Sequence, residues 1–401
     1  MLQHHTGIVM LDKASRLAFF STPKAGTTTA CQVMFAHTGQ LEVAKGYKPP
    51  PGSSSPWPNY QTDWEHNYFE EVWARQPDHH IPRSWTCKTS CGKTHAQHEP
   101  LACVKLLRWP MRRVVSSYLY AMGDEGFLIG QNWWMLRRVV LSSAKGVNQT
   151  LSDATGGKVP ARPYDPRIAA CSKACHTENP PRHGRESSSL ERCMVRCATF
   201  EHMIAALEAS AEQERKAKWR SFICWDHIFP QTDTRCDLDL ATRSATTYLP
   251  LETISHGLRA LQTVANFTFS EEMISHTSAK QRVNGTTYNT EQEKVPLPTA
   301  NRSSAAGHGN RTAKMDVART PYSELLALYG KGKSPPYRLF LADPAIRERV
   351  RILFSRDLTL YDYACRQPIL DSSACAGRCR PAHCADPILA GLPKLERKVD
   401  S

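Results

Sequence analysis

The features that this 401-residue chain lacks narrow its class before any motif is considered. No uninterrupted apolar run approaches the ~18 residues that a transmembrane helix needs. The opening segment, MLQHHTGIVMLDKASR, has no continuous apolar core of the kind that defines a secretory leader. There is also no internal repeat and no nucleic-acid-binding motif. The sequence therefore predicts an enzyme-sized globular chain and argues against a membrane-spanning protein, a solenoid or a nucleic-acid binder.

Acidic residues are also in deficit: 38 Asp and Glu stand against 51 Lys and Arg, which gives a formal net charge of +13. A solvated basic surface is one explanation of this excess. The other is a basic cleft, which would attract anionic ligands and make their binding sensitive to salt.

A further absence concerns nucleotide binding. Residues Phe19 to Thr29 read FFSTPKAGTTT, in which Lys24 precedes Gly26. The Walker order G-x-x-x-x-G-K-[ST] is therefore missing, which disfavours an ordinary nucleoside triphosphatase or P-loop kinase. The segment still predicts a buried strand, a tight turn and a helix. Gly26 permits close approach of an anion to the backbone, the threonines can cap the helix, and Lys24 adds a cation. A helix-capping loop without a ligand is the alternative.

The second informative segment is VKLLRWPMRRVVSSYLYAM, residues 104–122. It contains the pattern R-x-P-x-x-R-x-x-S-x-Y and predicts a short strand followed by a helix. Pro110 falls in the first helical turn, where a missing N–H costs nothing. Arg108 at the strand end and Ser116 on the helix are placed to hold one phosphate, the arginine by a bidentate fork and the serine by its hydroxyl. A basic amphipathic surface helix would give the same pattern.

In this order the two motifs resemble those of sulfotransferases that use 3′-phosphoadenosine 5′-phosphosulfate (PAPS). The resemblance is closest to Golgi carbohydrate sulfotransferases of the chondroitin and HNK-1 type. WDHIFPQTDTRCDLD and the following YLPLETISHGL resemble the family's H-x-x-P-Q…C and L-E-T segments. VRILFSRDLTLYDYAC resembles its closing Y-x-x-D-[FL]-x-L-[FY]-x-Y. These islands span roughly residues 16–364, and Trp109 stands where the family usually has aspartate.

The resemblance implies transfer of a sulfuryl group from PAPS to a glycan hydroxyl, without a metal. The acceptor class would include acidic polysaccharides, and nucleic acid is not an expected partner. Lys24 would stabilise charge on the leaving phosphate. The implied 5′-phosphosulfate site consists of Lys24, Ala25, Gly26, Thr27, Thr28 and Thr29, and the implied 3′-phosphate site of Arg108, Arg113 and Ser116.

A general base must also take the proton of the acceptor hydroxyl, and relatives use histidine or glutamate. His95 and His98 precede the second motif, and a histidine has an unperturbed pKa of about 6.5, suited to this task. Glu99 and His227 are further candidates. Two other readings stay open: a sulfotransferase with another acceptor, such as protein tyrosine, and a non-catalytic Cys-rich secreted binding module.

The 14 cysteines bear on the cellular compartment. Several form C-x-x-x-C pairs, and those at Cys171/Cys175 and Cys193/Cys197 fit two helices stapled side by side by disulfides. Zinc binding is the alternative, although zinc sites favour C-x-x-C. Five N-x-[ST] sequons begin at Asn148, Asn266, Asn284, Asn301 and Asn310. Together these features predict a glycosylated protein of the Golgi lumen or secretory pathway.

The predicted fold is α/β, a P-loop-like central parallel sheet flanked by helices, with Cys-rich insertions and a Cys-rich tail. A sulfotransferase domain would span residues 1–364, with an irregular loop region at 45–100 and a Cys-containing helical insertion at 148–200. Residues 365–401 would form the tail. LERCMVRCATFEHMIAALEASAEQERKAKW has strong helical periodicity. Members of the family usually carry a cytoplasmic tail, a membrane anchor and a stem, so we expect this sequence to lack that N-terminal part.

Overall fold

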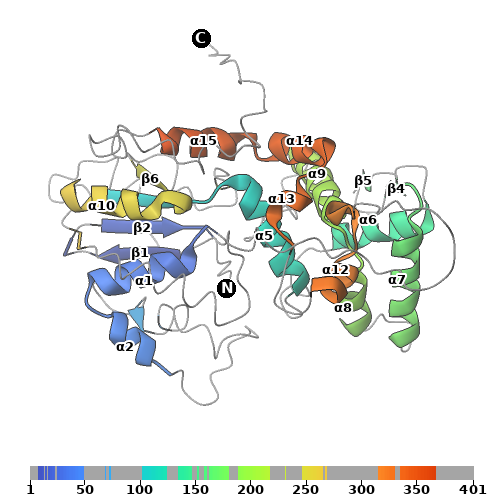
Figure 1. Cartoon of the computed structure of the whole chain (residues 1–401), viewed down its shortest axis with the longest axis horizontal. Helices are drawn as coiled ribbons and strands as arrows, with labels where there is room; N and C mark the ends of the chain where they lie inside the picture. The colour runs from blue at the N-terminus through green and yellow to red at the C-terminus, as the bar shows by residue number, and fades with distance from the viewer. Residues whose placement is uncertain are drawn as a thin grey trace, which may run out of the picture.

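Four strands form the central sheet in the order β1–β2–β3–β6, at the left of Figure 1. The neighbours β2–β3 and β3–β6 are parallel, and β1 pairs antiparallel with β2. The predicted α/β fold with a parallel sheet is confirmed, and the antiparallel strand at its edge is an addition to it. The strands are β1 (Ile8–Asp12), β2 (Leu17–Ser21), β3 (Ala102–Leu107) and β6 (Thr246–Pro250).

The structure is a computed structural model. It describes residues 8–12, 14–15, 17–22, 25–48, 68, 72–73, 102–123, 134–146, 151–152, 158–159, 162–179, 188–216, 231, 246–264, 267–268, 315–329 and 335–366.

Both faces of the sheet are covered by helices. Phe19 and Leu249 belong to a buried cluster on one face, where α1 and α10 pack. On the other face α15 packs against β6, and the rings of Tyr248 and Tyr363 lie 6.3 Å apart. Apolar side chains on both faces are what a parallel sheet between helices requires. These helices are α1 (Thr27–His37), α2 (Leu41–Gly46), α10 (Ile254–Val264) and α15 (Ser355–Cys365).

Helix α5 leads from the sheet into a second, mainly helical half, at the right of Figure 1. A large buried cluster joins α5 to the helices of this half. The elements are α5 (Pro110–Gly123), α6 (Trp134–Lys145), β4 (Leu151–Ser152), β5 (Lys158–Val159), α7 (Pro166–Glu178), α8 (Ser188–Arg196), α9 (Phe200–Lys216), α12 (Tyr322–Tyr329), α13 (Tyr337–Phe340) and α14 (Pro344–Leu353). Two short 3-10 turns, η4 (Leu251–Thr253) and η6 (Val317–Arg319), complete the described elements.

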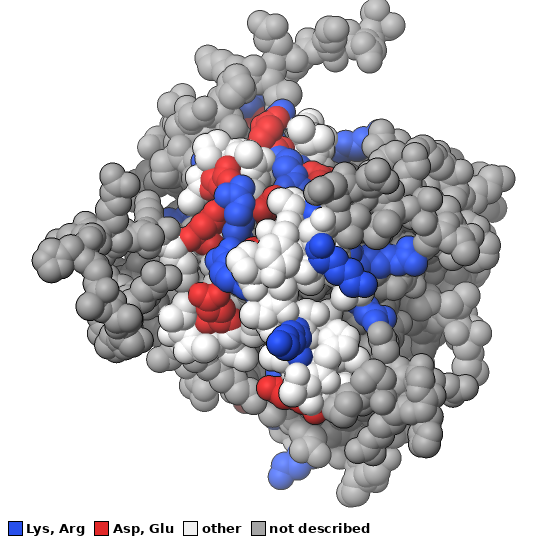
Figure 2. Space-filling model, turned by 90° about the vertical axis from the view of Figure 1, so that its right-hand side faces the viewer, with Lys and Arg blue, Asp and Glu red and all other residues white. Residues whose placement is uncertain are grey.

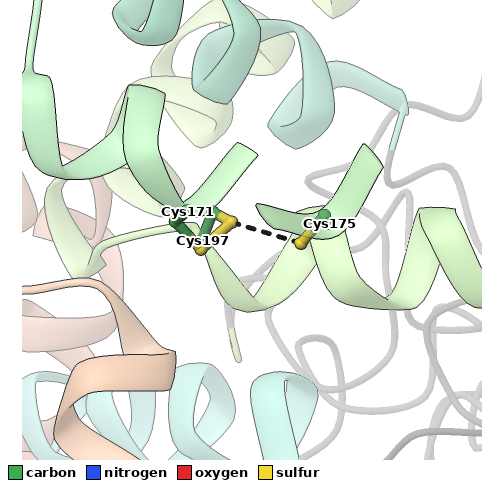
Figure 3. Close-up of side chains that lie close together, drawn as sticks. All are labelled: Cys171, Cys175 and Cys197. Carbon is green, nitrogen blue, oxygen red and sulfur yellow. Dashed lines mark hydrogen bonds between the residues drawn. A yellow bond between two sulfur atoms is a disulfide. The ribbon is translucent and has the colours of Figure 1, made fainter. Parts of the chain in front are cut away.

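The helices α7 and α8 are stapled by two disulfides, as the cysteine spacing predicts. The bonds are Cys171–Cys197 and Cys175–Cys193, a connectivity that the sequence leaves open. Figure 3 shows how closely the sulfurs gather: those of Cys171, Cys175 and Cys197 lie within 4.8 Å of one another. Such a group could suggest a metal site, but a sulfur in a disulfide has no thiolate to offer a metal. The structure therefore favours disulfides over zinc.

The stretch of strong helical periodicity after residue 190 forms two helices, α8 and α9. The chain turns at residues 197–199, and Thr199 starts α9. The Thr199 Oγ1 accepts from the His202 N–H at 3.1 Å, and the Nδ1 of His202 accepts from the Thr199 N–H at 3.2 Å. Thr199 is the N-cap residue of α9 and His202 is its third helical residue, so the two form a capping box in which histidine takes the place of glutamate or glutamine. The local hydrogen bonds of Thr199 thus override the helical periodicity.

The buried His202 ring predicts a pH dependence of stability. Burial, assisted by the nearby Arg162, lowers the pKa of His202 from 6.5 to about 4. The unfolded chain therefore takes up this proton at higher pH than the folded chain. The free energy of unfolding should fall as the pH drops from about 6.5 to about 4, by about 3 kcal/mol from this residue.

Denaturant titrations across this pH range would measure that loss. His202→Gln keeps an acceptor for the Thr199 N–H and has no group that titrates there, so its slope should be shallower. His176→Gln, the same substitution at an exposed position of α7, gives the baseline for this comparison. An unaltered slope in His202→Gln would contradict the assignment.

The described part of the face seen in Figure 2 carries charges of both signs. Within the helical half, Glu201 accepts from Arg162, Arg319 and Arg349 at 2.9–3.2 Å. Burial raises the pKa of Glu201, but the three arginines outweigh it and hold that pKa below its usual value. Glu201 thus matches three of the basic residues in the described part of the helical half.

Parts of the predicted organisation lie outside the described residues. In the region 45–100, Tyr68 and Trp73 are described, and both are buried against Phe35 of α1. The tail after residue 366 and most of the sequons are not described, and the domain boundaries stay predictions. In the described part of the chain, no helix has the length and apolarity to cross a bilayer.

Candidate functional site

The two sequence motifs follow neighbouring parallel strands. Ser21, the last residue of β2, pairs with Leu106 near the end of β3. The loops after these strands therefore start at the same edge of the sheet. In open α/β sheets, ligands bind outside the carboxyl ends of the strands. This edge is the candidate site.

The first loop turns tightly from β2 into α1. The Ala25 N–H donates to the Thr22 carbonyl at 2.9 Å, and the Ser21 hydroxyl donates to the Ala25 carbonyl at 3.3 Å. Gly26 has φ 94° and ψ 33°, a left-handed conformation that favours glycine. These contacts hold the loop against the strand end, with α1 starting at Thr27.

The prediction that the threonines cap this helix is wrong. Gly26 is the N-cap residue of α1 and has no side chain to accept a hydrogen bond, while Thr27, Thr28 and Thr29 form the first turn. Within the described part of the chain, no side-chain acceptor caps α1. A helix start without a side-chain cap leaves N–H groups that a ligand can satisfy, next to the positive end of the helix dipole. Such a helix start can bind an anion.

A second observation points to a ligand at the same loop. Thr22 is 2% exposed, and its Oγ1 has no hydrogen-bond partner among the residues that the structure describes. A buried hydroxyl without a partner costs free energy, and few are left so in folded proteins. A phosphate or sulfate oxygen at this loop would satisfy it.

The second loop places Arg108 between the end of β3 and the start of α5. Arg108 is partly exposed, whereas Arg113 is 2% and Ser116 5% exposed. The first turn of α5 contains no acidic residue. It contains Arg112 and Arg113, which therefore lie at the positive end of the helix dipole. Cations there oppose the dipole, and an anion would stabilise the arrangement.

Position 109, at the start of α5, lacks the aspartate that is usual in the family that the motifs resemble. An aspartate at position 109, just before Pro110, would stand at the N-cap position. Here the Trp109 N–H donates to the Glu252 Oε1 at 3.2 Å, so a carboxylate reaches this helix start from another segment. The Trp109 ring is 3% exposed and packs edge-on against Tyr337, with centroids 5.8 Å apart.

The turn after β6 connects the two loops. A Cβ built on Gly26 would lie 2.7 Å from the Leu251 Cδ1, so Leu251 packs directly on the first loop. The next residue, Glu252, accepts a hydrogen bond from the backbone N–H of Trp109 in the second loop. It also accepts one from the Tyr361 hydroxyl at 2.8 Å. The turn after β6 thus contacts both loops, the first at Gly26 and the second at the start of α5.

Several predicted residues lie outside the described residues, namely Lys24, His95, His98, Glu99 and His227. Their roles stay predictions. Comparisons with protein-family models, with curated proteins and with solved structures each returned no match.

Three residues at this edge have roles that sequence reasoning misses: Thr22, Gln231 and Glu252. Gln231 lies in the P-Q segment and Glu252 in the L-E-T segment. The sequence shows that these segments resemble the family, but it does not show what they contact. Thr22 lies within the first motif, ahead of the glycine. In each case the signal is membership of a motif, and only the fold shows the surroundings of the side chain.

Proposed function

We propose that this protein is a PAPS-dependent sulfotransferase that acts on a glycan hydroxyl. The 5′-phosphosulfate binds at the uncapped start of α1, and the 3′-phosphate binds at the start of α5. This arrangement is P-loop-like, with the anion held by backbone N–H groups between a strand and a helix.

One observation carries the proposal: the four sequence islands that resemble the sulfotransferase family lie together at one edge of the sheet. Leu251 packs on the first motif, and Glu252 accepts hydrogen bonds from the second motif and from Tyr361. Gln231 forms hydrogen bonds with both Arg108 and Asp357. These residues are far apart in sequence. Chance matches would be scattered over the fold.

The chemistry needs position and charge more than covalent participation. Sulfuryl transfer, like phosphoryl transfer, is an in-line displacement, so oriented donors and cations supply most of the catalysis. The Gly26–Thr29 backbone and Lys24 stabilise the charge of the phosphosulfate, and Arg108 and Ser116 orient the nucleotide. His95 or His98 takes the acceptor proton, and no metal is required.

The covalent structure supports the proposed compartment. Disulfides persist in the secretory pathway and are rare in the cytosol. The two stapling bonds and the five sequons support a Golgi lumen or other secretory location for this enzyme.

Transfer of labelled sulfate from PAPS to a panel of glycans tests the proposal, with tyrosine-containing peptides as the competing acceptor class. Label on a glycan supports it, and label on the peptide alone supports a tyrosine sulfotransferase. Calorimetry with adenosine 3′,5′-bisphosphate separates these from the third alternative. No binding of that nucleotide would leave a non-catalytic binding module.

Gly26→Ala should weaken binding of adenosine 3′,5′-bisphosphate and destabilise the fold. The backbone there has φ +94°, which costs an alanine about 1–2 kcal/mol. The new Cβ would also displace the Leu251 side chain and disturb Glu252 beside it. Calorimetry and thermal unfolding measure the two effects.

Gly39→Ala is the matched control. Gly39 has φ +72°, so an alanine there carries a similar backbone cost, but a Cβ meets nothing within 4 Å. This variant should lose stability and keep its nucleotide affinity. Equal affinities in the two variants would remove Gly26 from the site.

A further inference from the structure

We propose that Gln231 is a positioning residue that sets the direction of the Arg108 side chain. The inference rests on the proposed function, in which Arg108 holds the 3′-phosphate. It goes beyond that function by assigning a task to a residue that does not need to touch the nucleotide.

The side-chain amide of Gln231 clamps the backbone of Arg108. Its Oε1 accepts from the Arg108 N–H at 3.0 Å, and its Nε2 donates to the Arg108 carbonyl at 2.8 Å. Arg108 lies one residue beyond the end of β3. The amide thus gives this residue the pair of hydrogen bonds that a neighbouring strand gives within a sheet.

Gln231 is itself held from both sides. Its N–H donates to the Asp357 Oδ2 at 2.6 Å, and its carbonyl accepts from the Lys105 Nζ at 2.7 Å. All three residues are at most 2% exposed. Lys105 belongs to β3 and Asp357 to α15, so the clamp is anchored to the sheet and to the helix that covers it.

A fixed backbone matters for an arginine that must bind bidentately. The guanidinium is at the end of a long side chain, and ordering such a chain costs conformational entropy. Fork-like binding to a phosphate also needs accurate placement, within a fraction of an ångström. Hydrogen bonds to both the N–H and the carbonyl of Arg108 fix its backbone. They therefore restrict the direction in which the side chain leaves the backbone. Loss of the clamp should therefore weaken contact with the 3′-phosphate specifically.

The experiment compares two nucleotides by calorimetry: adenosine 3′,5′-bisphosphate, and adenosine 5′-monophosphate, which lacks the 3′-phosphate. Gln231→Met removes both amide hydrogen bonds at similar volume. It should lower affinity for the bisphosphate about tenfold and leave affinity for the monophosphate unchanged. In an Arg108→Ala background, Gln231→Met should have no further effect on bisphosphate binding.

The outcomes are distinct. Equal losses for both nucleotides, or no loss, would overturn the positioning role. Failure of the unaltered protein to bind the bisphosphate would instead refute the proposed function. Gln32→Met, which alters a glutamine of α1 that is 2% exposed, is the matched control and should not discriminate between the nucleotides.

If Gln231→Met does not fold, Gln231→Glu tests the same point. It keeps an acceptor for the Arg108 N–H but sets a carboxylate oxygen against the Arg108 carbonyl, so it too should lose bisphosphate affinity selectively.

Discussion

Lys24→Ala should lower the rate of sulfuryl transfer by a factor of about 10²–10³, the usual cost of removing one preorganised charge-stabilising group. The lysine falls in the loop between β2 and α1, which starts at the carboxyl edge of the sheet. Charge accumulates on the bridging oxygen and the leaving phosphate as the bond to sulfur breaks. In the proposed mechanism, the substitution removes the cation that stabilises this charge. Initial rates with labelled PAPS measure the effect.

The fold should survive this change, because the described contacts of the loop are made by Ser21, Thr22 and Ala25. Circular dichroism and thermal unfolding would confirm it. Lys45→Ala is the control, since Lys45 pairs with Glu42 on the surface of α2. That variant should retain full activity. Full activity in Lys24→Ala would instead remove the lysine from the proposed mechanism.

Loss of the disulfide Cys171–Cys197 should be the largest single effect on stability. The bond closes a loop with a sequence separation of 26, and the other bond, with a separation of 18, lies inside that loop. By the loop-entropy relation, losing this bond alone should cost about 3–4 kcal/mol, and losing both bonds should cost more. The helix pair packs on α6, and the Tyr118 hydroxyl of α5 donates to the Ala198 carbonyl at 3.1 Å. The loss should therefore reach the core of the helical half.

Denaturant unfolding with and without a dithiol reductant measures this cost, and a variant with serine at the four cysteines of α7 and α8 should reproduce it. Ala174→Ser, at an exposed position of α7, controls for adding a hydroxyl to the helix. A midpoint that reductant does not change would contradict the stapling role of these bonds.

Sequence reasoning predicts the elements near the motifs better than those remote from them. The turn at Gly26 and the helix at Pro110 have local causes, a left-handed glycine and a proline in a first turn, so both are correctly placed. The break between α8 and α9 has a local cause too, the Thr199–His202 capping box, but helical periodicity hides it. The threonines fail as caps because Gly26 takes the N-cap position.

The sequence alone determined where the two strand–turn–helix segments at Gly26 and Pro110 lie, the cysteine spacing and the alternation of strands and helices, because these depend on residues close together in the chain. The tertiary structure decided which segments meet. Gln231 lies beside Arg108 across 123 positions of sequence, and Glu252 beside Trp109 across 143. The cysteine pairing was decided in the same way, by how α7 lies against α8. Long-range contacts of this kind depend on how the whole chain packs, and no local pattern encodes them.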